Sequence, residues 1–217
     1  MWQTVPMKTL AAVVATLFVA LMMSCLSSWG NPAAAANPYL LQTGDIVFEG
    51  TAGQQSDAIR EATASPFTHC GVVFVQDGHV MVLEAVQPVR VSSVEQFIAR
   101  SAPGTFHARR LKTPPSQAAI DRAWQWGSTL RGRDYDDLFR WDDEKLYCSE
   151  LVWKVFQHAG IELCPRRHFR DYHLDGPVVK KIITGRYGSV DKLPADEWVV
   201  APADLAASPL LGEVPRR

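Results

Sequence analysis

The sequence predicts a single α+β domain with antiparallel strands. An Asp77-Gly78 dipeptide joins two apolar, β-branched runs, which is the strongest short signature of a β-hairpin. Apolar residues recur at helical spacing in two later segments, 115–133 and 148–159. Because strands and helices occupy separate parts of the chain, the pattern favours an α+β architecture.

The first 36 of the 217 residues read as a secretory signal. Lys8 precedes an apolar run over 10–23, and small residues lead to an Ala-Ala-Ala site that ends at Ala36. This is the pattern of a Sec-type signal peptide, and it predicts export to the periplasm or the extracellular space. A lipoprotein acylated at Cys25 is the first alternative, and an uncleaved anchor is the second.

Cleavage after Ala36 leaves residues 37–217, enough for one domain with its own core. The formal net charge is −1, and no basic stripe runs along the chain, so a nucleic-acid partner is not expected. The short clusters Arg109-Arg110 and Arg166-Arg167-His168 are interpreted as solvated surface. The oligomeric state is left open.

The first half of the domain predicts short elements around the hairpin. Residues 41–50 form a strand entered through Gly44-Asp45. Residues 56–65 form a helix, capped by Ser56 or Asp57 and ended by Pro66. After the hairpin, Ser92 and Glu95 have the spacing of a capping box, which predicts a helix over about 93–100.

The second half predicts a strand over 105–111 and a helix begun by Pro115 and Ser116. The next helix starts at Cys148 and ends at Gly160. Proline and glycine punctuate 164–190, which is expected to be a loop. Residues 197–210 are expected to return as a final strand and a short helix.

Cys148 stands at the first turn of its helix, on the apolar face. A helix N-terminus and a nearby imidazole lower a thiol pKa, so Cys148 is a candidate nucleophile, although a buried cysteine is often only a small hydrophobe. Residues 37–217 hold three cysteines, and an odd count leaves a free thiol or an intermolecular bridge. A Cys70–Cys164 disulfide, which the sequence neither requires nor excludes, would leave Cys148 free.

The hairpin register selects a histidine for the same site. With a two-residue turn, Gly71 faces Glu84, and His69 lies diagonal to Glu84 on the same face of the sheet. Cys70 falls on the opposite face and is not expected to take part in the chemistry. The remaining histidines, interpreted as solvated or hydrogen-bonded side chains, are His79, His107, His158, His168 and His173.

Four stretches of the chain carry a resemblance to a known family. In order they are GDIVF, THCGVVF, EAV and YCSELVWKVFQHAGI. They resemble the YiiX-like group of permuted papain-fold amidases, relatives of the NlpC-type cell-wall peptidases, over roughly residues 41–210. The histidine strand precedes the cysteine helix, which is the circularly permuted order. The resemblance implies a papain-like fold with Cys148 as nucleophile, His69 as base and Glu84 as the residue that orients the base.

Together these features predict an exported thiol-dependent hydrolase that cleaves peptide or N-acyl amide bonds, with cell-wall peptide or lipid as candidate substrates. Alternatives are a lipid acyltransferase or thioesterase with the same Cys148–His69 pair, and a non-catalytic acyl- or peptidyl-binding module. The backbone N–H of Cys148 is the expected oxyanion donor, and Tyr147 is a candidate pocket residue. No cofactor is expected, and Cys148, His69 and Glu84 lack the ligand spacing of a zinc site.

Overall fold

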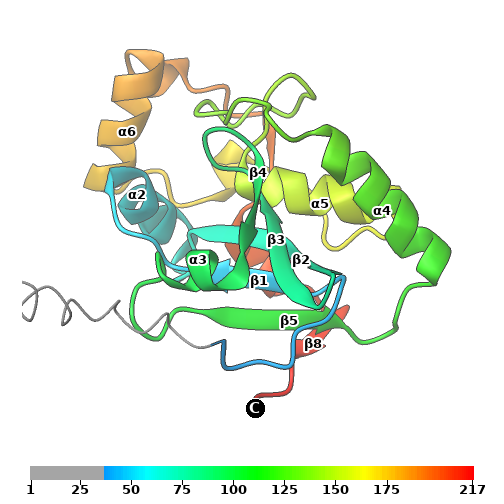
Figure 1. Ribbon diagram of the computed structural model, residues 1–217. Helices are drawn as coiled ribbons and strands as arrows, with labels where there is room; N and C mark the ends of the chain where they lie inside the picture. Colours follow the sequence, from blue (N-terminus) through cyan, green and yellow to red (C-terminus); the bar gives the residue numbers. More distant parts are fainter. Residues whose placement is uncertain (1–36) are drawn as a thin grey trace, which may run out of the picture. The chain divides into compact units, whose positions relative to one another are not determined.

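The computed structural model describes residues 37–217, so the predicted signal segment and Cys25 lie outside the described residues. A six-stranded antiparallel sheet runs through the described part in the order β4-β3-β2-β1-β5-β8 (Figure 1). Its strands are β1 (Ile46–Glu49), β2 (His69–Gln76), β3 (His79–Glu84), β4 (Arg90–Ser93), β5 (His107–Leu111) and β8 (Leu211–Glu213).

Helices cover the sheet unevenly. The helix α5 packs against β2 and β3, α4 packs against α5, and α2 and α6 form a separate pair (Figure 1). None of the described helices is long and apolar enough to span a membrane. The helices are α2 (Gln54–Thr63), α3 (Val94–Ile98), α4 (Gln117–Thr129), α5 (Cys148–His158), α6 (Pro177–Tyr187) and α7 (Pro202–Ala206). A two-stranded ribbon joins β6 (Arg167–His168) to β7 (Trp198–Val199), with 3₁₀ turns at Phe169–Asp171 and Val190–Lys192. The α+β class is confirmed.

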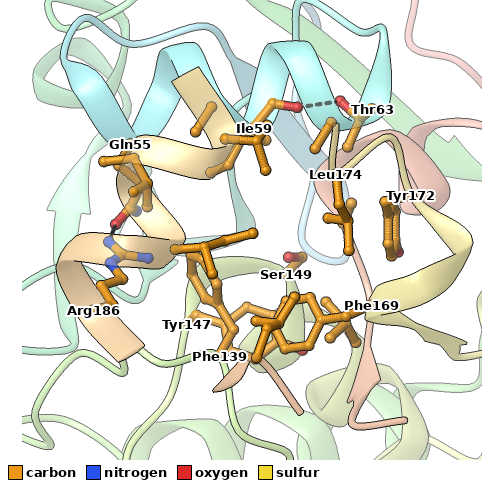
Figure 2. A pocket seen from close by; sticks show the side chains of 18 of the residues that line it. Gln55, Ile59, Thr63, Phe139, Tyr147, Ser149, Phe169, Tyr172, Leu174 and Arg186 are labelled. Atoms are coloured by element: carbon orange, nitrogen blue, oxygen red, sulfur yellow. Dashed lines mark hydrogen bonds between the residues drawn. The ribbon is translucent and has the colours of Figure 1, made fainter. Parts of the chain in front are cut away.

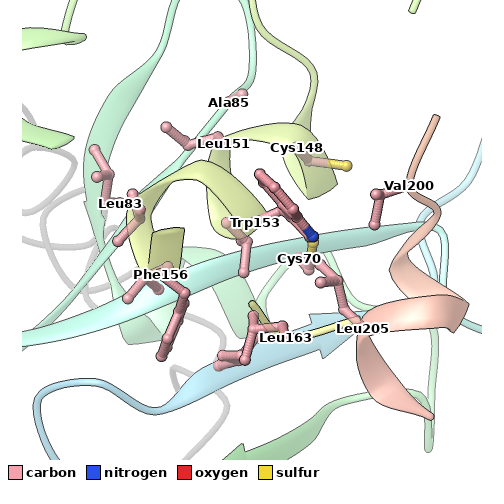
Figure 3. Close-up of a cluster of buried hydrophobic side chains, with 14 of the residues drawn as sticks. Cys70, Leu83, Ala85, Cys148, Leu151, Trp153, Phe156, Leu163, Val200 and Leu205 are labelled. Carbon is pink, nitrogen blue, oxygen red and sulfur yellow. The ribbon is translucent and has the colours of Figure 1, made fainter. Parts of the chain in front are cut away.

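The two faces of the sheet bury different cores, because side chains alternate along each strand. Cys70 and Leu83 pack with Leu151 and Trp153 in the larger core, on the α5 side (Figure 3). A smaller cluster on the other face includes Phe97 of α3. The helix α5 therefore packs on the face of β2 that carries Cys70, whereas His69 belongs to the opposite face and reaches Cys148 at the end of the strand.

The hairpin register is confirmed. Gln76 pairs with His79, and the pairing continues inward to Val72 and Leu83. Both turn residues have positive φ, 51° at Asp77 and 79° at Gly78. These are the dihedrals that a type I′ turn needs, and they are the reason that aspartate-glycine predicts it.

Both predicted caps in the first half of the domain are wrong. The α3 cap is Ser93, whose side chain accepts a hydrogen bond from the Gln96 backbone while Gln96 closes the capping box. Ser92 instead pairs with Val82 as part of β4. The helix α2 begins at Gln54 behind Gly53, so neither proposed residue, Ser56 or Asp57, caps it.

The predicted loop over 164–190 is also wrong in part, because it contains β6 and α6. Pro177 opens α6 where a missing N–H costs nothing, and Gly188 ends it with φ 85°. The strands β4 and β8 were not predicted, and β7 pairs with β6 rather than with the main sheet. The helix start at Ser116 and the end of α5 at Gly160 are confirmed.

Candidate active site

Cys148 is the first residue of α5, and neighbouring residues fix the helix start in place. The Ser149 hydroxyl donates to the carbonyl of Val200 at 2.6 Å, and the Val200 N–H donates to the Tyr147 hydroxyl at 3.3 Å. Both bonds tie this turn to the segment that follows β7. Cys148 is therefore held at a helix N-terminus, where the helix dipole favours a thiolate.

His69 and Glu84 form a buried hydrogen-bonded pair. The distance from His69 Nε2 to Glu84 Oε2 is 2.7 Å, and the imidazole stacks on the Phe97 ring. Gly71 lies between them on the shared face. A Cβ at Gly71 would lie 2.5 Å from a Val82 methyl carbon and 2.9 Å from the Leu83 carbonyl oxygen, so a side chain there would strain the pairing of β2 with β3, the two strands that carry His69 and Glu84.

The Glu84 carboxylate has three further partners that the sequence did not predict, which are Ser92, Arg100 and, at 3.6 Å, Arg90. The Ser92 hydroxyl donates to Oε1 at 2.6 Å, and Arg100 donates to Oε2 at 2.6 Å. Burial alone would raise the pKa of Glu84. The bonds and charges of His69, Ser92 and Arg100 outweigh burial and lower that pKa to about 2. The carboxylate is therefore ionised at neutral pH.

The Cys148 thiol reaches both His69 and Cys70 at the end of β2. Burial disfavours a charged imidazole, but hydrogen bonding to Cys148 and Glu84 outweighs it and raises the pKa of His69 to about 10. The Cys70 hydrogen bond, and then the bond and charge of His69, lower the pKa of Cys148 well below its usual value against the effect of burial.

Cys70 lies on the face opposite Glu84, as predicted, and this face is the one that α5 covers. Its thiol therefore contacts Cys148 instead of lying apart from the site. All three cysteines of the described residues are free thiols, so the considered Cys70–Cys164 disulfide is not formed. Burial raises the pKa of Cys164 to about 12, which leaves it unreactive near neutral pH.

Glu49 adds a second buried carboxylate to the site. The Ser101 hydroxyl donates to it at 2.6 Å, and Arg100 lies 3.5 Å away. The possible ligand atoms of Glu49, His69 and Glu84 lie within 4.8 Å of one another, close enough to hold a metal ion. Arg100, however, bridges the two carboxylates and takes the place of a cation. This arrangement does not fit a resident metal.

A pocket of about 110 Å³ opens beside Cys148, between α2, α6 and the start of α5 (Figure 2). Its wall is almost entirely apolar or aromatic. Tyr147 lines it, as the sequence analysis expected of a pocket residue, while its hydroxyl also serves the helix start. Residues that the sequence did not single out make up the rest, among them Ile59, Phe139, Phe169, Leu174, Val179 and Ile183.

The order of the elements and this site can be compared with known proteins. The family model of the permuted papain-like amidases, YaeF/YiiX type, C92 family, matches residues 40–214. The chain belongs to this family. A curated relative, the YiiX protein of Escherichia coli K12, is 34% identical over 184 residues, which cover 84% of this chain and 89% of the relative.

A solved structure extends the family assignment to the fold. It is described as the crystal structure of metalloprotein yiiX from Escherichia coli O157:H7, and it superposes with a TM-score of 0.76 at 34% identity. The match covers 81% of this chain and 97% of that one. The permuted papain-like fold is therefore confirmed, and the family is one of cysteine-type amide hydrolases, so the chain is an enzyme of that class.

Proposed function

We propose that this C92-family enzyme cleaves N-acyl amide bonds with Cys148 as nucleophile, His69 as base and Glu84 as the residue that orients the base. The observation that carries the proposal is the position of His69, which contacts the Cys148 thiol on one side and Glu84 on the other. Nucleophile, base and orienting acid in contact are the arrangement that covalent acyl transfer requires.

The reaction follows from this arrangement. The thiolate of Cys148 attacks the amide carbon, and the backbone N–H of Cys148 at the helix start donates to the oxyanion. The Tyr135 hydroxyl, which accepts a bond from Gln55 Nε2 at 2.9 Å, keeps its own proton for a second donation. The C–N bond then breaks, and the amine leaves with the proton of His69. Water, deprotonated by His69, attacks the thioester and releases the acid and the thiol.

The apolar pocket favours an acyl chain over a polar peptide as the group held next to the thiol. A hydrocarbon chain gains about 0.8 kcal/mol for each CH₂ group that leaves water, whereas peptide groups buried without partners would lose free energy. This observation also supports the second candidate, a lipid acyltransferase or thioesterase. In that reaction the same thioester forms, and an acceptor other than water takes the acyl group.

The related Escherichia coli O157:H7 structure is described as a metalloprotein, but no metal enters the mechanism proposed for this chain. A cation on Glu49, His69 and Glu84 would have to displace Arg100 and break the bond from Nε2 of His69 to Glu84. That bond orients the base in the proposed reaction. Each step of the reaction is therefore assigned to side chains of this chain.

We further propose that the enzyme acts in the cell envelope after removal of residues 1–36. Sequencing the N-terminus of the protein from the envelope fraction should give Asn37 as the first residue. An acylated Cys25 at the N-terminus would instead make it a lipoprotein, and an intact Met1 would make the leader an anchor.

The function is tested by incubating the purified protein with a panel of fatty-acyl amides, thioesters and short peptides. The expected result is acyl-amide hydrolysis that disappears in Cys148→Ala and survives in the matched control Cys164→Ala, which removes another buried free thiol. Acyl transfer to an added amine or alcohol in preference to water would favour the transferase. Turnover that persists in Cys148→Ala would refute the assigned nucleophile.

A further inference from the structure

One end of the apolar pocket carries a small polar cluster. Arg186, in the last turn of α6, donates to Oε1 of Gln55, and the Gln55 amide donates to the Tyr135 hydroxyl. Figure 2 shows Arg186 and Gln55 at one side of the pocket and Tyr172 and Leu174 at the other. Among the described residues that line the pocket, Arg186 is the only basic one, and no acidic residue joins it.

The charge of Arg186 is poorly compensated within the described residues. The side chain is only 18% exposed, and its guanidinium lies 5.0 Å from the centre of the Phe139 ring. Its carboxylate partner in residues 37–217 is Asp137, at 3.4 Å, whose side chain is 70% exposed. A half-enclosed cation beside an apolar wall attracts an anion more strongly than a surface arginine, because less water screens it.

Tyr135 connects this cluster to the reacting thiol. Burial raises the pKa of its hydroxyl, the Cys148 thiolate raises it further, and the Arg186 guanidinium lowers it. Cys148, Tyr135 and Arg186 also line the same pocket, so a substrate whose amide is at Cys148 can extend to Arg186 within it.

We propose that Arg186 binds a carboxylate on the amine portion of the substrate, so that the preferred substrates are N-acyl amino acids with the acyl chain in the apolar part of the pocket. This inference rests on the proposed function of the same site. A single guanidinium matches the single charge of a carboxylate and can pair with it through two parallel hydrogen bonds. A bound carboxylate would replace the exposed Asp137 as the partner of Arg186.

A purely structural role is the competing explanation, since the Arg186–Gln55 bond also joins α6 to α2. The two roles differ in what they predict for ligands. A structural arginine stabilises the pocket for every ligand equally, whereas an anion-binding arginine favours only ligands with a carboxylate. Two ligands that differ only in the carboxylate therefore distinguish the structural role of Arg186 from the anion-binding role.

The test measures binding to Cys148→Ala protein, in which turnover cannot interfere, by titration calorimetry. The ligands are N-decanoylglycine and N-decanoylglycinamide, which share the chain and the amide. We expect the carboxylate to bind about tenfold or more tightly than the carboxamide, the range of one charge-assisted hydrogen bond. Arg186→Gln should abolish this preference. The control Lys180→Gln removes a charge from the solvent side of the same helix and should retain it.

A second variant keeps the test independent of the α6–α2 contact. Asp137→Asn removes the competing carboxylate from an exposed position and should tighten N-decanoylglycine binding severalfold, with no change for the glycinamide. Equal affinities for the two ligands, binding of neither, or a preference that survives Arg186→Gln would overturn the inference. If N-decanoylglycine binds preferentially but the wild-type enzyme releases no glycine from it, the proposed function is wrong and Arg186 is still an anion-binding residue.

Discussion

At the scale of single residues, the charge of Glu84 is the feature that suits His69 to the role of base in the proposed mechanism. A buried carboxylate is costly unless it is paired, and Glu84 is paired with His69, Ser92 and Arg100 at 2.6–2.7 Å. It therefore stays ionised and favours the imidazolium that forms when His69 takes the proton of Cys148. In the proposed mechanism Glu84 acts through His69, so it is a positioning residue.

Glu84→Gln should lower kcat by at least about tenfold and change KM much less, because the charge matters most when His69 is protonated. The matched control is Glu49→Gln, a second buried carboxylate beside the same Arg100. Burial raises the pKa of Glu49 despite the opposing charges of His69 and Arg100, which favours the neutral form that glutamine resembles. Steady-state kinetics with one acyl amide compares kcat and KM of the two variants. A larger loss of kcat in Glu49→Gln than in Glu84→Gln would mean that Glu49 orients His69.

The sequence was sufficient to predict some residues of the site and not others. His69 and Glu84 follow from one hairpin whose turn is fixed by two residues. Arg100 and Cys70 were not predicted as contacts, because their positions depend on how α3 and α5 pack on opposite faces of the sheet. Sequence spacing within one strand cannot provide that information.

At the scale of elements, two adjacent serines at the start of α3 have different roles. Ser93 caps the helix, whereas Ser92 is 3% exposed and donates to Glu84. Ser93→Ala should therefore lower the free energy of unfolding by about 1 kcal/mol, the usual cost of a lost N-cap. It should change kcat little. Ser92→Ala should lower kcat, because it removes a donor that keeps Glu84 ionised. Urea unfolding and steady-state kinetics of both variants test these expectations. A loss of stability in Ser92→Ala together with a loss of kcat in Ser93→Ala would contradict them and favour Ser92 as the helix cap.

The longer elements were predictable, and several short ones were not. The helices α4 and α5 carry an apolar stripe over three turns, and the hairpin has a turn signal between two apolar runs. The strands β4, β6 and β8 have four residues or fewer, too few for alternation to show. The helix α6 lies in a stretch rich in glycine and proline, and it packs on α2 rather than on the main core, so its pattern resembled a loop.

At the scale of the whole molecule, folding itself brings together the charges of the site, and this links stability to pH. Glu84 has a folded pKa of about 2, below the ordinary value of 4.5. Its contribution to stability is complete above about pH 4.5 and is lost as the pH falls towards 2. The free energy of unfolding, measured in urea between pH 5 and 3, should fall less steeply in Glu84→Gln than in the wild type. Parallel pH dependence in the two proteins would mean that Glu84 gains no pairing on folding.

The most direct test of the central claim, that β2 and α5 create a thiolate at Cys148, is the pH dependence of its alkylation. Iodoacetamide labelling, with sites located by mass spectrometry, should modify Cys148 rapidly at about pH 6, well below the unperturbed thiol pKa of about 8.5. Cys164 should stay unlabelled there, and His69→Gln should return Cys148 to the behaviour of an ordinary thiol. A Cys148 rate that rises only near pH 8.5 in the wild type, or earlier labelling of Cys164, would contradict the account.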